Sequence, residues 1–171
     1  MIGNIIYKAI VFSEAAHTAV GQVRKYTGEP YHTHPLAVAE IVENIGGTKY
    51  MIAAALLHDL VEDTQITLDQ IDRVFGHDVT FLVYWLTDTQ TLDKGNRATR
   101  KARECLSLSE APAEAQTIKL ADLIHNSESI LQHDPKFARV FIKEMRAILE
   151  VMLKGDPTLY ARAWEIVNQQ E

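Results

Sequence analysis

Cysteine is almost absent from this chain, since Cys105 is the only one among 171 residues. An intramolecular disulfide and a zinc cage built from several thiolates are therefore excluded, and a reducing compartment such as the cytoplasm is expected. No motif surrounds Cys105, so we interpret it as a small apolar helix residue and not as a nucleophile.

Long apolar runs are missing as well. The longest, Met51 to Leu57, is far shorter than the roughly 20 residues that a membrane-spanning helix needs. The first residues, MIGNIIYKAIVF, include Lys8 and lack a small-residue cleavage pattern, so no signal peptide is expected. These features predict a cytoplasmic protein that does not contact a membrane.

The chain has no excess of basic residues. It carries 17 Lys and Arg against 23 Asp and Glu, a net charge of −6, which argues against a nucleic-acid partner. Basic residues nevertheless gather in two short segments, which are Arg24 with Lys25 and the group Lys94, Arg97, Arg100, Lys101 and Arg103. Either segment could attract the phosphates of a small nucleotide, although a solvated helix face explains the second group about equally well.

Alternating strand patterns are absent, and apolar residues recur at helical spacing instead. We predict an all-α fold in a single domain, residues 1–171, without internal repeats or linkers. Glycine, proline and capping threonine residues divide the chain into helices expected at 4–21, 35–45, 49–64, 68–75, 77–88, 97–109, and after Pro112, Pro135 and Pro157. A polar loop is expected at 87–96, and the residues Val79, Leu82, Val83 and Leu86 are expected to face the core.

Four residues stand out as candidate metal ligands: His34 at a helix entry, His58 and Asp59 after the apolar run, and Asp122 in KLADLIHN. Two imidazoles and two carboxylates are ligands that suit a divalent ion such as Mn²⁺, Fe²⁺ or Zn²⁺. They are less typical of a purely structural zinc site, which usually has thiolate ligands. A bare His-Asp pair more often marks a helix end in solvent. Here the ionisable groups directly follow a buried run, where leaving them unpaired would be costly and a metal would offset that cost.

Further polar residues accompany these candidates at helical spacing. Glu62 and Asp63 follow His58 and Asp59 by four residues each, so either carboxylate could accept a proton from a metal-activated water. Asn126 and Ser129 share a helix stripe with Asp122 and could reach a bound ligand. The remaining histidines show no ligand pattern, and we predict that none binds metal: His17, His32, His77, His125 and His133.

The segments HTAVGQVRKYTGEPYHTHPLAVAEIV, AAALLHDLVEDT and KLADLIHN resemble, in that order, the hydrolase domain of RelA/SpoT-type proteins in the HD phosphohydrolase superfamily. The matching motifs lie between about residues 17 and 131. The bifunctional members carry a synthetase domain after the hydrolase, for which 171 residues leave no room. The chain is therefore similar to the stand-alone small alarmone hydrolases, such as the metazoan SpoT homologue.

The resemblance implies an all-helical enzyme that uses one Mn²⁺ to remove the 3′-pyrophosphate from guanosine tetra- or pentaphosphate. It implies metal ligands at His34, His58, Asp59 and Asp122, and catalytic carboxylates at Glu62 and Asp63. It further implies a guanidinium against the base at Arg24, and nucleotide contacts at Lys25, Asn126 and Ser129. Separately from the resemblance, the basic segment GNRATRKAR leads us to expect phosphate contacts from Arg97 and Arg100. Leu123 and Glu128 stand where the family usually has basic residues, which affects nucleotide contacts and leaves the metal ligands in place.

Three other functions remain open at this stage. The same metal chemistry would serve hydrolysis of an adenine alarmone or removal of the 2′-phosphate of NADPH, because the sequence does not define the base pocket. A nucleotide-binding module without turnover is the third, although every expected catalytic residue is present. The apolar and aromatic residues of the last helix, including Leu159, Tyr160 and Trp164, could support a homo-oligomer or cover the core.

Overall fold

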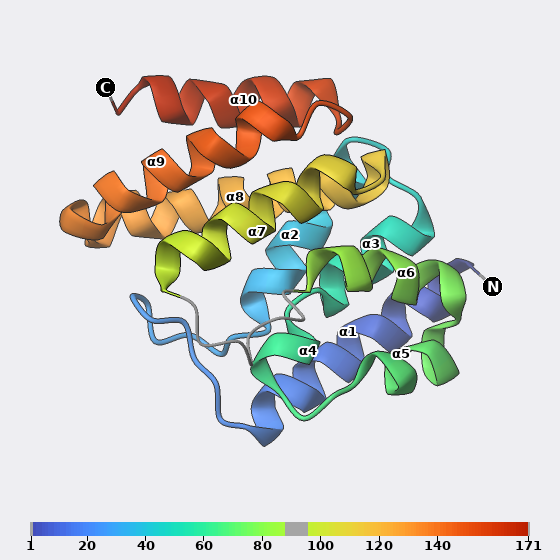
Figure 1. Ribbon diagram of the computed structural model, residues 1–171. Helices are drawn as coiled ribbons and strands as arrows, with labels where there is room; N and C mark the ends of the chain where they lie inside the picture. Colours follow the sequence, from blue (N-terminus) through green and yellow to red (C-terminus); the bar gives the residue numbers. More distant parts are fainter. Residues whose placement is uncertain (1, 88–95, 171) are drawn as a thin grey trace. The chain divides into compact units, whose positions relative to one another are not determined.

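The computed structural model describes residues 2–87 and 96–170, and the chain groups into two compact units, Met1–Thr89 and Gln90–Glu171 (Figure 1). The first unit holds α1 (Ile2–Ala19), α2 (Thr33–Asn44), α3 (Lys49–Leu57), α4 (Leu60–Asp63), α5 (Leu68–Phe75) and α6 (His77–Leu86). The second holds α7 (Arg97–Glu110), α8 (Ala113–His133), α9 (Pro135–Val151) and α10 (Pro157–Asn168). The predicted all-α fold is confirmed, while the prediction of a single domain stays a prediction.

Helix α3 forms the centre of the first unit, as its uniformly apolar sequence predicts. The Thr48 hydroxyl caps its start by accepting a hydrogen bond from the Met51 N–H at 3.2 Å, and every residue from 51 to 57 is buried. Helices α1, α2 and α6 all contact α3. His58, which directly follows the buried last turn of α3, is therefore held in a fixed position and is itself buried.

The prediction of one helix over residues 49–64 is wrong. Helix α3 ends at Leu57, a turn contains His58 and Asp59, and the short α4 follows. His58 Nδ1 donates to the Ala55 carbonyl at 2.7 Å, which is the carbonyl that the Asp59 N–H would reach in a continuous helix. The imidazole thus competes with the backbone at the point where the helix breaks.

Helix α1 is shorter than predicted at its end, because Gly21 adopts a positive φ of 65° that stops it after Ala19. Its buried stripe consists of Ala9, Ser13 and His17. A turn segment then leads to α2. Within this segment, Val23 and Pro30 form an isolated antiparallel bridge. His34 is the second residue of α2, so its predicted place at a helix entry is confirmed.

Helices α5 and α6 are joined at Gly76, whose φ is 83°. A capping box between Thr67 and Gln70 starts α5 as the sequence predicts. On α6, Val79, Leu82 and Val83 are buried. Leu86, which we expected to face the core, is only half-buried and is the last residue of the helix.

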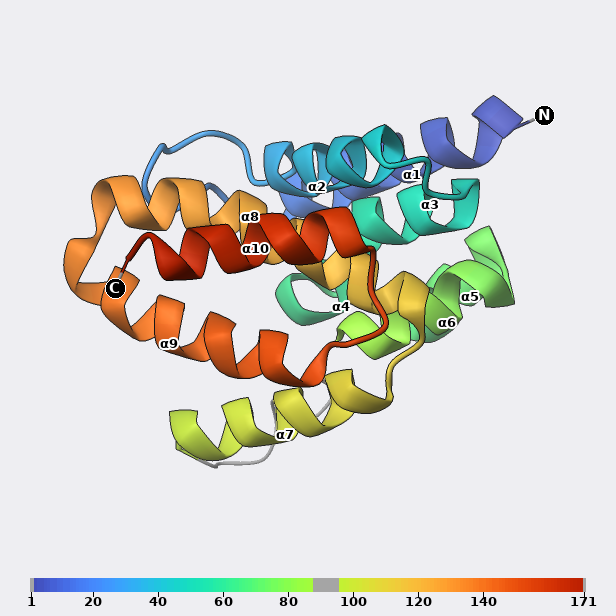
Figure 2. The same ribbon diagram turned by 90° about the horizontal axis from the view of Figure 1, so that it is seen from above.

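In the second unit, α8, α9 and α10 lie side by side and α7 packs against α9 (Figures 1 and 2). Pro112 is the N-cap of α8 rather than its first residue, whereas Pro135 and Pro157 are the first residues of their helices. In α10, Leu159 is buried and the Tyr160 hydroxyl donates to the Leu149 carbonyl at 3.1 Å. These two side chains therefore cover the core of their own unit, and self-association stays a prediction.

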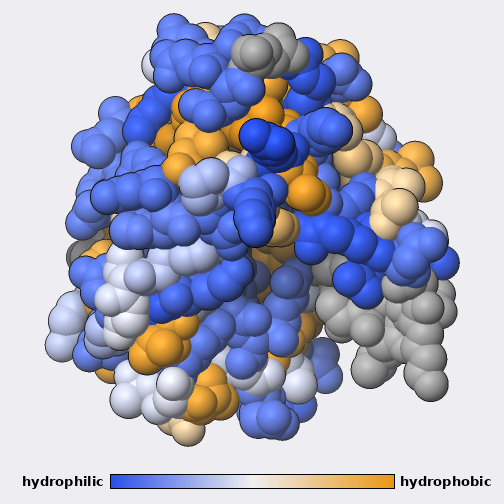
Figure 3. Space-filling model, turned by 90° about the vertical axis from the view of Figure 1, so that its left-hand side faces the viewer, coloured by the Kyte–Doolittle hydropathy of each residue, from blue (hydrophilic) through white to orange (hydrophobic). Residues whose placement is uncertain are grey.

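One face of the molecule is largely polar. Figure 3 shows one face of the molecule, on which hydrophilic residues predominate and apolar ones form small separate groups. Among the described residues, no helix is both long and apolar enough to cross a membrane. The predicted loop at 87–96 and Lys94 fall almost wholly outside the described residues.

Candidate functional site

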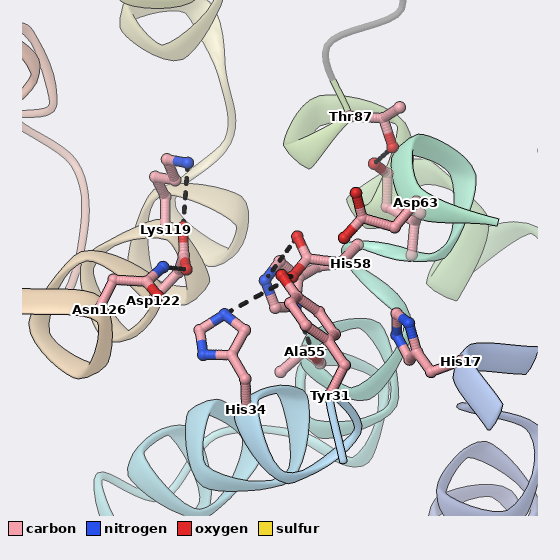
Figure 4. Close-up of polar contacts among 12 residues, drawn as sticks. His17, Tyr31, His34, Ala55, His58, Asp63, Thr87, Lys119, Asp122 and Asn126 are labelled. Carbon is pink, nitrogen blue, oxygen red and sulfur yellow. Dashed lines mark hydrogen bonds and ion pairs between the residues drawn. The ribbon is translucent and has the colours of Figure 1, made fainter. Parts of the chain in front are cut away.

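Three of the four predicted metal ligands come together in the first unit. His34 from the start of α2 and His58 and Asp59 from the turn after α3 each offer a ligand atom, and these atoms lie within 4.8 Å of one another. Figure 4 shows the rings of His34 and His58 beside each other. Both imidazoles are buried, whereas Asp59 is half-buried. Two imidazole nitrogens and one carboxylate this close together could hold a divalent ion.

The orientation of the His58 ring supports a cation at this point. Its Nδ1 must carry a proton, because the Ala55 carbonyl 2.7 Å away can only accept a hydrogen bond. Its Nε2 then faces Oδ1 of Asp59 at 3.1 Å. In the neutral imidazole this contact brings two lone pairs together, which is unfavourable unless Nε2 is also protonated or a metal ion lies between the two atoms.

The other oxygen of Asp59 is held by Tyr31, which lies in the turn segment before α2. The Tyr31 hydroxyl donates to Oδ2 at 2.7 Å, and His34 Nε2 lies 3.6 Å from the same oxygen. The carboxylate thus faces both imidazoles while a neutral donor fixes its plane. The arrangement fits a divalent metal ion, and a hydrogen bond from a second residue to a ligating carboxylate is typical of such sites.

Asp122, the fourth predicted ligand, lies on α8 in the second unit and is 6% exposed. Its carboxylate accepts hydrogen bonds from Lys119 Nζ at 3.0 Å and from Asn126 Nδ2 at 2.6 Å. The Ser129 hydroxyl in turn donates to the Asn126 carbonyl at 3.3 Å. The predicted stripe of Asp122, Asn126 and Ser129 is thus present, while its part in metal and nucleotide binding stays a prediction.

The two predicted catalytic carboxylates are exposed on α4. The Asp63 N–H donates to the Asp59 carbonyl at 3.0 Å, so Asp63 lies one turn beyond the proposed ligand even though the longer helix is broken. Its side-chain oxygen Oδ2 accepts from Gln22 Nε2 at 2.8 Å. Asp63 is therefore exposed to solvent close to Asp59, and Glu62 is exposed on the same short helix.

The basic pair between α1 and α2 is arranged around aromatic rings. The Arg24 guanidinium lies over Tyr31, 5.7 Å from the ring centroid, and Lys25 Nζ lies 4.7 Å from the centroid of Tyr26. Tyr31 therefore contacts both a proposed metal ligand and the proposed base-binding arginine. Sequence reasoning missed this residue, although the GEPY segment that contains it was part of the recognised motif.

The second unit contains a pocket of about 220 Å³. Its polar lining pairs basic with acidic side chains: Arg97 makes a two-pronged contact with Glu144 at 2.6 and 2.8 Å, and Glu104 contacts both Lys101 and Lys119. Burial would raise the pKa of Glu104, but the two lysines outweigh it and hold that pKa below its usual range.

The lining of this pocket includes one of the two arginines predicted to contact phosphate, and phosphate binding by either one stays a prediction. Arg97 and Asn126 both line it, together with Phe137, over whose ring the Arg97 guanidinium lies at 5.2 Å. Arg100 is exposed on α7 and is not among the lining residues. Lys119 belongs to the paired charges as well, since its Nζ contacts both Glu104 and Asp122.

Comparisons with known proteins agree with these features. A family model described as HD domain matches residues 9–150. The chain is 33% identical over 147 residues to a Synechocystis protein named probable guanosine-3′,5′-bis(diphosphate) 3′-pyrophosphohydrolase, covering 84% of this chain and 19% of that protein. It is 35% identical over 130 residues to a Brucella ovis protein named GTP pyrophosphokinase rsh, covering 74% and 17%. The chain thus spans about a fifth of the length of these curated relatives.

A solved structure matches over almost the whole chain. It is that of a metazoan orthologue of SpoT, described as hydrolysing ppGpp and acting in starvation responses. The TM-score is 0.88 at 25% sequence identity, and the match covers 98% of this chain and 96% of that one. Unlike the curated relatives, this protein has about the same length as the present chain.

Proposed function

We propose that this chain, which belongs to the HD domain family, removes the 3′-pyrophosphate from guanosine tetra- and pentaphosphate with one divalent metal ion, Mn²⁺. The observation that carries the proposal is the convergence of His34, His58 and Asp59 on one point in a buried, oriented arrangement. The names of the relatives and of the matched structure supply the substrate class. A cytoplasmic location follows from the single cysteine.

The metal would be held by His34, His58 and Asp59, with Asp122 as the fourth ligand. The chemistry that such an ion supplies is stabilisation of negative charge on a phosphoryl oxygen and a lower pKa for a nearby water. Tyr31 fixes the Asp59 carboxylate through its hydroxyl, so this ligand keeps its orientation when the nucleotide binds. No thiolate takes part, which agrees with a catalytic rather than a structural metal.

The remaining residues handle the proton and the nucleotide. Glu62 and Asp63 accept the proton of the attacking water, because both are exposed beside the proposed ligand Asp59. Arg24 packs on the base, and the side chains that contact the rest of the nucleotide are Lys25, Asn126, Ser129, Arg97 and Arg100. Anionic phosphates compete with Glu144 for Arg97, whose guanidinium geometry suits either partner.

Product analysis tests this proposal. The purified protein is incubated with guanosine tetraphosphate, its adenosine counterpart or NADPH, with Mn²⁺ and then with a chelator, and the products are separated by ion exchange. We expect pyrophosphate from the guanosine compound, lost on chelation. Orthophosphate from NADPH alone would instead indicate a 2′-phosphatase, and bound nucleotide without product would indicate a binding module.

Replacing Arg24 by alanine should raise KM about tenfold and change kcat by less than about twofold. A guanidinium stacked on a base contributes about 0.5–2 kcal/mol, and an interaction present equally in the ground and transition states affects KM and not kcat. Steady-state kinetics with guanosine tetraphosphate measures both constants. Arg73→Ala, at an exposed position of α5, is the control, and a fall in kcat without a change in KM would contradict the proposed contact.

A further inference from the structure

His17 and Gln22 connect the end of α1 to the carboxylate of Asp63. His17 is 1% exposed, and its Nδ1 lies 2.7 Å from Gln22 Oε1. Gln22 Nε2 donates to Asp63 Oδ2 at 2.8 Å. We call these two side chains, His17 and Gln22, the brace.

The direction of both hydrogen bonds in the brace is fixed. Because the Gln22 amide donates its N–H to a carboxylate, its carbonyl oxygen must face His17 and can only accept. His17 Nδ1 therefore carries the proton. Burial lowers the pKa of His17, an effect only partly offset by the Gln22 hydrogen bond and by Asp59 and Asp63, so the ring is neutral near pH 7 and Nε2 is an acceptor.

The histidine is energetically unfavourable where it lies. Its Nε2 is buried and has no hydrogen-bond partner within the part of the chain that the structure describes. A buried polar atom in that condition costs about 1–3 kcal/mol, and an apolar ring at the same place would avoid the cost. What a histidine supplies at position 17, and an apolar ring would not, is the Nδ1–H that donates to Gln22.

The backbone builds the brace from local sequence. After α1 ends, the Gln22 N–H donates to the His17 carbonyl at 3.2 Å, and Gly21 takes a positive φ of 65°. This turn folds Gln22 back toward the helix end that carries His17. Asp63 comes from α4, 41 residues later, so one short turn holds a side chain on a separate helix.

We propose that His17 and Gln22 are positioning residues that hold the Asp63 carboxylate for proton transfer. The proposal rests on the proposed function, in which Asp63 is a catalytic carboxylate. The side chain of an exposed aspartate can adopt several rotamers. Misplacing a catalytic group by about 1 Å can reduce the rate about 10²-fold. The amide N–H occupies Oδ2 and leaves Oδ1 to accept the proton of water.

The first test is Gln22→Met, which keeps the side-chain length and removes both hydrogen bonds. We expect kcat for pyrophosphate release to fall about tenfold to a hundredfold, with KM within about twofold and Mn²⁺ affinity by isothermal titration unchanged. Gln170→Met makes the same chemical change at an exposed residue of the second unit and should leave kcat unchanged. Gln22→Glu places a carboxylate opposite Asp63, and its kcat should fall at least as far as that of Gln22→Met. This variant replaces Gln22→Met in the test if the methionine variant does not fold.

The second test is His17→Phe, which keeps an aromatic ring beside Tyr31, whose ring centroid lies 4.8 Å from that of His17. We expect kcat to fall while the thermal unfolding midpoint is unchanged or raised, and the double variant with Gln22→Met to be no slower than Gln22→Met alone. A lower midpoint with unchanged kcat would show a structural role and overturn the proposal. An inactive wild-type protein would instead reject the proposed function, whereas an active wild type with fully active variants rejects only the brace.

Discussion

Replacing Asp59 by alanine is expected to abolish turnover and divalent-metal binding while leaving the helical content nearly intact. Asp59 is the carboxylate that both imidazoles face, at 3.1 Å from His58 and 3.6 Å from His34. Metal-ion stabilisation of a phosphoryl transition state is worth several kcal/mol, so the rate should fall on the order of 10³-fold or more. The measurements are the rate of pyrophosphate release, bound metal after dialysis, and far-ultraviolet circular dichroism.

Asp72→Ala is the matched control, because Asp72 is an exposed aspartate of α5 in the same unit. It should retain full activity and full metal binding. Asp59→Ala itself removes the acceptor of the Tyr31 hydroxyl, so a small loss of stability is expected and does not count against the assignment. Retained activity or retained metal binding in Asp59→Ala would contradict it.

The second large effect is expected at the two exposed carboxylates of α4. Glu62→Gln and Asp63→Asn should each lower kcat by about 10²-fold or more, because general acid–base catalysis contributes about 10²–10⁴-fold. Amides of the same shape cannot accept the proton at neutral pH. Metal binding should be unchanged in both variants, which separates these residues from Asp59.

Asp69→Asn, at an exposed position in the first turn of α5, controls for the loss of one negative charge in this unit. We expect no change in kcat there. If Glu62→Gln and Asp63→Asn bound metal and remained fully active, the proton would have to leave by another route. If either variant lost its metal, that residue would be a ligand and not a proton acceptor.

Much of the fold could be predicted because its signals are local. Thr48 and Thr67 accept the backbone hydrogen bonds expected of N-caps, and Gly76 ends a helix at a positive φ. The break between α3 and α4 could not be predicted from helical periodicity. At this break the His58 side chain donates a hydrogen bond to the Ala55 carbonyl. The bond requires one particular rotamer of His58, and the rotamer of a side chain cannot be read from the sequence.

In the candidate site, too, local contacts could be predicted from the sequence and long-range contacts could not. His58 and Asp59 are neighbours in the sequence, and Asn126 follows Asp122 by one helical turn, so their proximity could be predicted. The contacts of Tyr31 with Asp59, of Gln22 with Asp63 and of Arg97 with Glu144 join residues 28, 41 and 47 positions apart. Such contacts depend on how whole helices pack, and neither periodicity nor spacing within one segment reveals them.

The most direct measurement is a titration of the chelator-treated protein with Mn²⁺, in which bound metal and pyrophosphate release from guanosine tetraphosphate are followed together. The proposed mechanism predicts that the rate rises in proportion to bound metal and levels off at one ion per chain. Pyrophosphate release at the full rate before any metal is added, or one bound ion per chain without any release, would contradict it.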